Sequence, residues 1–211
     1  MIKGIIFDLD GVITDTAHYH FIAWQNLAKE IGIEFDEVFN ETLKGVSRME
    51  SLERILKLKN LNDKYTIEEK EALAHKKNEA YKKLIDNITS KDLLPGIKTL
   101  LDDLKANNIK IALASASKNA LSILNHLNIT SYFDYIVDAS KIANSKPAPD
   151  TFLDALNGLN LKADEVIGVE DAKAGIESIK ACNIKSIGIN VKGDISLSST
   201  KELTFDLLKT I

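Results

Sequence analysis

The sequence predicts an α/β protein in which a doubly wound, Rossmann-like parallel sheet is interrupted near its start by an all-helical domain. Three observations support this prediction. A short apolar segment at residues 4–7 runs directly into acidic residues, residues 15–90 carry only helical patterns, and short apolar strands alternate with helices after Leu94. The expected core domain therefore comprises 1–14 and 91–211, and the expected inserted domain comprises 15–90.

The first strand has the composition of a central strand, because Ile5, Ile6 and Phe7 are continuously apolar. Gly11 permits a sharp exit at its carboxyl end. Since strand side chains alternate between the two faces of a sheet, Asp8 and Asp10 point the same way. One site therefore receives both carboxylates, unless they only solvate a strand end or cap a turn.

The inserted segment reads as a helical bundle. Its first helix is expected from Thr16 to Ile31, with an apolar stripe at helical spacing. Ser47 to Glu50 and Thr66 to Glu69 both have the pattern of a capping box and predict two further helix starts.

Four later segments are expected to be strands, at 109–114, 133–138, 165–169 and 185–189, each preceded by a helix. Such alternation predicts right-handed crossovers and a parallel sheet. Asp8, Ser115 and the pair Glu170 and Asp171 then all fall at carboxyl ends of strands, where doubly wound sheets bind ligands. We expect them to meet in one crevice. Residues 190–211 predict a surface strand and a helix of unknown role.

Composition and net charge limit the classes of binding partner that we expect. The 211 residues are 45% hydrophobic and carry a net charge of -4, which gives no reason to expect nucleic acid or an anionic membrane as a partner. Cys182 is the sole cysteine and is expected to pack in the core, since no internal disulfide is possible. With no leader or membrane-spanning segment in the sequence, we expect a cytoplasmic protein, and a monomer because the crevice is complete within one chain.

Two neighbouring carboxylates at a strand end suit phosphoryl transfer. We predict that Asp8 attacks phosphorus as a nucleophile and that Asp10 transfers the proton as acid and base. Because an anion attacking a phosphate is repelled, the site needs a hard cation, and Mg²⁺ prefers carboxylate and carbonyl oxygens. Glu170 and Asp171 would supply further oxygen ligands, although Asp171 could instead cap the next helix.

Two polar groups would act on the transferring phosphate. Ser115 would donate a hydrogen bond, and Lys146 would neutralise charge on phosphoryl oxygens. A serine-rich turn can be only a helix cap, and a lysine before Pro147 can be only a surface residue. In the inserted segment, Arg48 offers a planar fork for a second, non-reacting phosphate.

The residues Asp8 to Thr16 resemble the first motif of the haloacid dehalogenase superfamily of phosphotransferases. Further blocks extend the resemblance to the β-phosphoglucomutase family, which covers the chain as far as Gly188: Ala17 to His20, Trp24, Leu43 to Arg48, Ala114 to Asn119, Ser145 to Asp150, and Glu170 with Asp171. The resemblance implies that Mg²⁺ is held by Asp8, the backbone carbonyl of Asp10, Glu170 and Asp171.

The same resemblance implies the residues that bind substrate. Those expected to hold the distal phosphate are Arg48, Ser117, Lys118 and Asn119, beside Ala116 in the same turn. Those expected to line or support the sugar pocket are Thr16, His20, Trp24, Lys44, Gly45, Val46, Ser47, Ser51, Lys77 and Asn78. Trp24 could instead be core, His20 a satisfied helix residue, and Lys77 and Asn78 solvent-facing groups.

By resemblance, the activity is the interconversion of β-glucose 1-phosphate and glucose 6-phosphate through an aspartyl phosphate, with β-glucose 1,6-bisphosphate as primer and intermediate. A magnesium-dependent phosphatase of small sugar phosphates is the alternative, in which water discharges the aspartyl phosphate. A third possibility is a sugar-phosphate sensor that binds without turnover.

Overall fold

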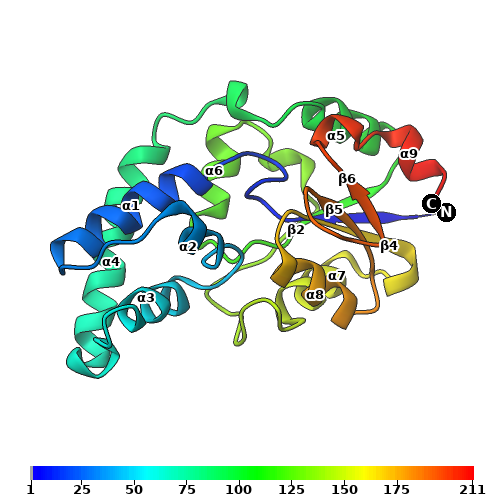
Figure 1. Cartoon of the computed structure of the whole chain (residues 1–211). Coiled ribbons are helices and arrows are strands. Elements are labelled where there is room, and N and C mark those ends of the chain that lie inside the picture. Colours follow the sequence, from blue (N-terminus) through cyan, green and yellow to red (C-terminus); the bar gives the residue numbers. More distant parts are fainter. Residues whose placement is uncertain (1) are drawn as a thin grey trace. The chain divides into compact units, whose positions relative to one another are not determined.

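The computed structural model describes residues 2–211, and its sheet confirms the predicted α/β class. Six parallel strands lie in the order β3-β2-β1-β4-β5-β6 (Figure 1). Their bounds are β1 Gly4–Phe7, β2 Lys110–Leu113, β3 Tyr135–Ile136, β4 Val166–Glu170, β5 Lys185–Ile189 and β6 Ile195–Leu197. The strand order reverses at β1, and this switch point is where doubly wound sheets bind ligands.

Helices cover both faces of the sheet. Figure 1 shows α7 (Asp150–Leu159) and α8 (Lys173–Ala181) on one face, and α5 (Ile97–Ala106) and α9 (Phe205–Lys209) on the other. α6 (Ala120–His126) follows β2. The core under α7 and α8 includes the buried residues Ile6, Ala112, Phe152, Leu156, Ile176 and Ile179. Because both faces are covered, β1 is buried along its whole length, and β2 and β5 are buried after an exposed lysine at their first position.

The register of β1 with its two neighbours brings three strand ends to one level. Phe7, the last residue of β1, pairs with Leu113 on one side and Val169 on the other. The pairing continues one residue further, because the Asp8 N–H donates to the Val169 carbonyl at 2.9 Å. Asp8, Ala114 and Glu170 therefore follow these paired residues directly on adjacent strands.

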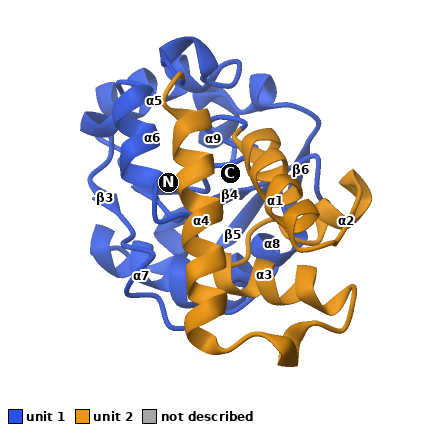
Figure 2. Ribbon diagram, turned by 90° about the vertical axis from the view of Figure 1, so that its left-hand side faces the viewer, with its two compact units in different colours: residues 1–15, 88–211 blue, residues 16–87 orange. Residues whose placement is uncertain are grey.

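The chain forms two compact units (Figure 2). The first, called the sheet unit, comprises residues 1–15 and 88–211, and the second, called the helical unit, comprises residues 16–87. The second unit contains only helices among its regular elements: α1 Ala17–Glu30, α2 Glu37–Glu41, α3 Arg48–Lys57 and α4 Ile67–Ile85. Trp24, Leu27, Leu52 and Ile55 belong to its own buried core. Short 3-10 turns complete the chain at 62–64, 90–92, 130–132, 163–165 and 200–202.

The two predicted helix starts in this unit are observed. Thr66 and Glu69 form a complete capping box, with the Thr66 hydroxyl oxygen accepting from the Glu69 N–H and the Glu69 carboxylate accepting from the Thr66 N–H. Ser47 is the N-cap residue of α3, and its hydroxyl oxygen accepts from the Glu50 N–H at 3.3 Å.

The strand expected at 133–138 was predicted too long, because the Asp134 carboxylate binds a backbone N–H of β2 at its start and the chain turns at Asp138, directly after the Val137 N–H donates to the Leu113 carbonyl. The Asp134 carboxylate accepts from the N–H of Ile111, and the Asp138 carboxylate accepts from the N–H and hydroxyl of Ser140. Only Tyr135–Ile136 remains as β3.

The strand and helix expected after residue 190 are present as β6 and α9. Cys182 packs as predicted, since it is 9% exposed and its thiol donates to the Pro149 carbonyl at 3.4 Å. Along residues 2–211, no helix is both long and apolar enough to span a membrane.

Candidate active site

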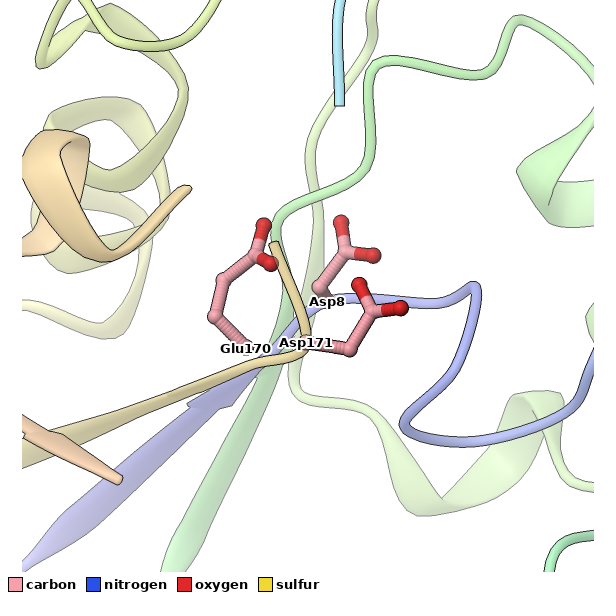
Figure 3. Close-up of side chains that lie close together, drawn as sticks. All are labelled: Asp8, Glu170 and Asp171. Carbon is pink, nitrogen blue, oxygen red and sulfur yellow. The ribbon is translucent and has the colours of Figure 1, made fainter. Parts of the chain in front are cut away.

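Three carboxyl groups meet at the switch point of the sheet. Asp8 follows β1, Glu170 is the last residue of β4, and Asp171 comes next. One oxygen from each lies within 4.8 Å of the others. Figure 3 shows all three carboxyl groups directed to the same side of the strand ends. Asp8 and Glu170 are buried, whereas Asp171 is half-buried.

Lys146 joins this cluster from the loop that leads to α7. It is not a surface residue, because its side chain is 0% exposed. Its Nζ donates to Asp8 Oδ1 at 2.6 Å, to Glu170 Oε1 at 2.6 Å and to the Ala114 carbonyl at 3.0 Å. These contacts use all three N–H groups of the ammonium. Pro147 separates it from α7, which begins at Asp150.

The charge states of Asp8 and Lys146 depend on each other. Burial raises the pKa of Asp8 to about 7, the Lys146 ammonium opposes this rise, and Glu170 and Asp10 add to it. Burial alone would lower the pKa of Lys146, but Asp8 and Glu170 raise it above the ordinary value. The lysine is therefore charged at neutral pH, and it is the group that favours ionised Asp8.

The donor set fits a divalent cation. The Lys146 ammonium pairs with Asp8 and Glu170, and the carboxylate of Asp171 lies beside both, so three carboxylate oxygens face one position. Burial is the largest cause of the raised pKa of Asp8, and the negative charges of Glu170 and Asp10 add to it. Oxygen ligands of this kind suit Mg²⁺ rather than a softer metal.

Gly11 shapes the turn beside the cluster. Its φ of +71° lies in the left-handed region, which favours glycine. A Cβ there would lie 2.1 Å from Asp171 Oδ2, so any side chain would displace that carboxylate. Asp10 lies in the same turn and is half-buried, and Asp171 is not the N-cap residue of α8, because that position belongs to Ala172.

The serine turn follows β2. Ser115 is buried, and its Oγ accepts from the Ser117 N–H at 3.1 Å, while Ser117 Oγ accepts from the Asn119 N–H at 3.2 Å. Both hydroxyls thus stabilise the turn as acceptors and keep their O–H as donors. In the same turn Asn119 is buried, Ala116 is half-buried and Lys118 is exposed.

A second group of predicted residues meets within the helical unit. Lys77 Nζ lies 2.7 Å from His20 Nδ1, and 4.7 Å from the ring centroids of both Trp24 and Tyr81. Tyr81 also stacks on His20 and donates to the Thr16 hydroxyl at 3.1 Å. Burial, followed by Lys77 and Arg48, lowers the pKa of His20 well below 6.5, so the ring is neutral and accepts from the ammonium.

The exposed fractions of three side chains resolve the alternatives that the sequence left open for Lys77, Asn78 and Trp24. Lys77 and Asn78 are 2% and 7% exposed, so they do not face solvent. Trp24 is 3% exposed and belongs to the helical core, as the alternative for this residue predicted.

The loop before α3 carries the other predicted residues. Lys44 pairs with Glu41 at 3.0 Å, Gly45 adopts a φ of +72°, and Val46 is buried. The Ser51 hydroxyl donates to the Ser47 carbonyl at 3.0 Å, so both serines stabilise the start of α3.

Arg48 is the first residue of α3 and is half-buried. Burial lowers the pKa of its guanidinium, and Glu79 and Tyr81 raise it. The group stays charged, since arginine does not deprotonate in proteins.

Sequence reasoning missed two aromatic residues. Phe152 is fully buried in α7, and its ring centroid lies 4.9 Å from Lys146 Nζ. Tyr81 is fully buried in α4, where it contacts His20, Lys77 and Thr16. Neither has a signal in the sequence, because a ring at helical spacing looks the same whether it packs on a lysine or on a leucine.

Comparisons with known proteins agree with this geometry. The model of the haloacid dehalogenase-like hydrolase family matches residues 5–189. A β-phosphoglucomutase of Bacillus subtilis is 48% identical over 98% of this chain and 93% of that protein. The crystal structure of a β-phosphoglucomutase from Clostridium difficile superimposes with a TM-score of 0.97 at 51% identity, covering 100% of this chain and 96% of that one. A phosphorylated carbohydrates phosphatase of Thermotoga maritima is 30% identical over 88% of this chain and 83% of that protein.

Proposed function

Because this chain belongs to the haloacid dehalogenase-like hydrolase family, we propose that it is an isomerase that interconverts β-glucose 1-phosphate and glucose 6-phosphate. The observation that carries the proposal is the buried contact of Lys146 with Asp8 and Glu170 beside Asp171. It provides a nucleophile, a cation and oxygen ligands in one place. The identity of 48% to a mutase, against 30% to a phosphatase, favours transfer to a sugar over transfer to water.

The proposed reaction starts with Asp8 phosphorylated. The 6-hydroxyl of β-glucose 1-phosphate attacks phosphorus, Asp10 takes the hydroxyl proton, and the bond from phosphorus to Asp8 breaks. The products are β-glucose 1,6-bisphosphate and free Asp8. After the bisphosphate turns around, Asp8 attacks the phosphorus on C1, Asp10 protonates the leaving oxygen, and glucose 6-phosphate leaves.

Lys146 and Ser115 have defined tasks in this scheme. The ammonium favours the ionised form of Asp8 and neutralises charge on the phosphoryl oxygens, and the Ser115 hydroxyl donates to one of them. Mg²⁺ held by Asp8, Glu170, Asp171 and the Asp10 carbonyl would supply further positive charge at the phosphoryl group.

For the helical unit we propose the role of a substrate-selecting cap, with domain boundaries near residues 14/15 and 90/91. Arg48, with Ser117, Lys118 and Asn119 of the sheet unit, would bind the second phosphate. Ala116 would lie beside this phosphate in the same turn. The sugar would be bound or supported by Thr16, His20, Trp24, Lys44, Gly45, Val46, Ser47, Ser51, Lys77 and Asn78.

We further propose that the enzyme works in the cytoplasm as a monomer on small sugar phosphates, without a nucleic-acid or membrane partner. The net charge of -4 and the single cysteine support this proposal.

One assay tests the activity. The protein is supplied with Mg²⁺, β-glucose 1-phosphate and a trace of β-glucose 1,6-bisphosphate, and the products are followed by phosphorus NMR. Glucose 6-phosphate is the expected product. Stoichiometric inorganic phosphate with glucose would establish a phosphatase, and saturable binding with no product would establish a sensor. Asp8→Asn is the control, and turnover by this variant would contradict the assignment of the nucleophile.

A further inference from the structure

Gly175 lies in the first turn of α8, is buried, and faces the carboxylate of Glu170. A Cβ built on Gly175 would lie 1.9 Å from both Cδ and Oε1 of that carboxylate. Non-bonded carbon atoms pack at about 3.5–4.0 Å. The carboxylate of Glu170 therefore occupies space that any other residue at position 175 would fill.

Glu170 is held in this space by contacts at both oxygens. Oε1 accepts from Lys146 Nζ at 2.6 Å, and Oε2 accepts from the Ala172 N–H at 2.8 Å. The side chain is 1% exposed. A shift of the carboxylate away from α8 would change the first contact, which aligns the ammonium that also binds Asp8.

The helix itself gives no reason for glycine at this position. Gly175 lies inside a regular helix and is not among the residues with positive φ, and alanine is favoured over glycine in helices. The requirement at position 175 is thus for space and not for backbone conformation.

We propose that Gly175 is a positioning residue, whose missing side chain lets Glu170 hold Lys146 against Asp8. The placement of Lys146 follows from the contacts alone, whereas its consequence for turnover rests on the function proposed above. Two readouts keep these parts separate: the side-chain ammonium resonance of Lys146 in nitrogen-15 NMR, and the rate of glucose 6-phosphate formation.

The test variant is Gly175→Ala. We expect the Lys146 ammonium resonance to shift or to disappear through faster hydrogen exchange, and kcat to fall about 100-fold, since a displacement of about 1 Å can cost that factor. KM should change little, because Gly175 lies outside the proposed substrate contacts.

Gly158→Ala is the matched control. Gly158 is also a helical glycine, in α7, and a Cβ there would lie 2.3 Å from the ring of Tyr135. This substitution also forces a neighbouring side chain to move, but not one that contacts Lys146. It should leave the ammonium resonance and kcat unchanged, whatever it does to the melting temperature.

Shortening the carboxylate provides the decisive measurement. In a Glu170→Asp background, Gly175→Ala should lower kcat by less than threefold. The aspartate side chain is one CH2 group shorter, so its carboxylate does not reach the space that the new methyl group fills. A Gly175→Ala protein with the ammonium resonance of the wild type would overturn the proposal. So would an equal loss of kcat in both backgrounds.

A variant that does not fold and a variant that folds without turnover lead to different conclusions. If Gly175→Ala alone fails to fold but the double variant folds, the clash with Glu170 is supported. If neither folds, the space does not serve Glu170 and the proposal is rejected. If no variant shows turnover, the function proposed above fails, and the ammonium resonance still decides the role of Gly175.

Discussion

Lys146 donates to Asp8 at 2.6 Å although 138 positions separate the two residues in the chain. The lysine side chain is fully buried and Asp8 is 6% exposed. The contact is therefore a buried ion pair, and removing one partner leaves the other charge without compensation. It links the stability of the sheet unit to the chemistry that we propose for it.

Lys146→Met removes the charge of the side chain and keeps an unbranched chain that is one atom shorter. We expect the free energy of unfolding at neutral pH to fall by about 3 kcal/mol, because Asp8 and Glu170 lose their shared cation. Turnover should fall at least about 100-fold. Urea denaturation and the mutase assay measure the two effects.

Lys141→Met is the control for this substitution. Lys141 lies in the same loop, but its side chain is 81% exposed and its pair with Asp138 is a surface pair. It should change neither quantity. Equal losses in both variants would show that the burial of Lys146 has no special weight.

Asp171→Asn should weaken Mg²⁺ binding. The carboxylate is one of three that could hold the ion, and an amide is a weaker ligand. We expect the rise in melting temperature on adding Mg²⁺ to shrink relative to the wild type, since a ligand that binds the folded state stabilises it. Differential scanning fluorimetry over a Mg²⁺ series measures the change.

The matched control is Asp164→Asn. Asp164 lies just before β4, whereas Asp171 lies just after it, so the two positions are at opposite ends of one strand. The control should respond to Mg²⁺ as the wild type does. A full Mg²⁺ response in Asp171→Asn would exclude that carboxylate from the metal site.

Arg48→Ala should raise KM for β-glucose 1,6-bisphosphate about 10- to 100-fold, the cost of losing hydrogen bonds between charged groups. Arg54→Ala removes a guanidinium from the same helix, where Arg54 pairs with Glu50, and should leave KM unchanged. Initial-rate kinetics decide, and an unaltered KM in Arg48→Ala would remove this residue from the phosphate site.

The free energy of unfolding should decrease as the pH is lowered from about 6.5, because of His20. The folded-state pKa of this ring lies well below 6.5, the ordinary value for histidine. Between these two pKa values the unfolded chain binds a proton at His20 and the folded chain does not. Stability then rises with pH and is lost as the pH falls. His20→Gln should make the dependence less steep between pH 7.5 and pH 5, measured by urea denaturation.

His18→Gln provides the comparison, because His18 lies on the same helix and is exposed. It should leave the pH dependence as it is in the wild type. If both substitutions have the same effect, the burial of His20 is not the cause.

Much of the candidate site could be predicted because strand ends are visible in a sequence. Asp8, Ser115 and Glu170 each follow an apolar segment, and parallel strands bring such positions to one edge. Lys146 was harder, because it lies in a loop and only the fold shows that its side chain is buried. Phe152 and Gly175 could not be assigned, since their importance depends on what they touch across the sheet unit.

The sequence alone therefore determined the α/β class, the helical insertion and the acidic strand ends, because hydrophobic periodicity and turn residues act over a few neighbouring positions. Only the tertiary structure decided which groups share protons and charge. Burial raises the pKa of Asp8 and lowers that of His20, and such shifts arise from atoms that are distant in the chain but adjacent in the fold.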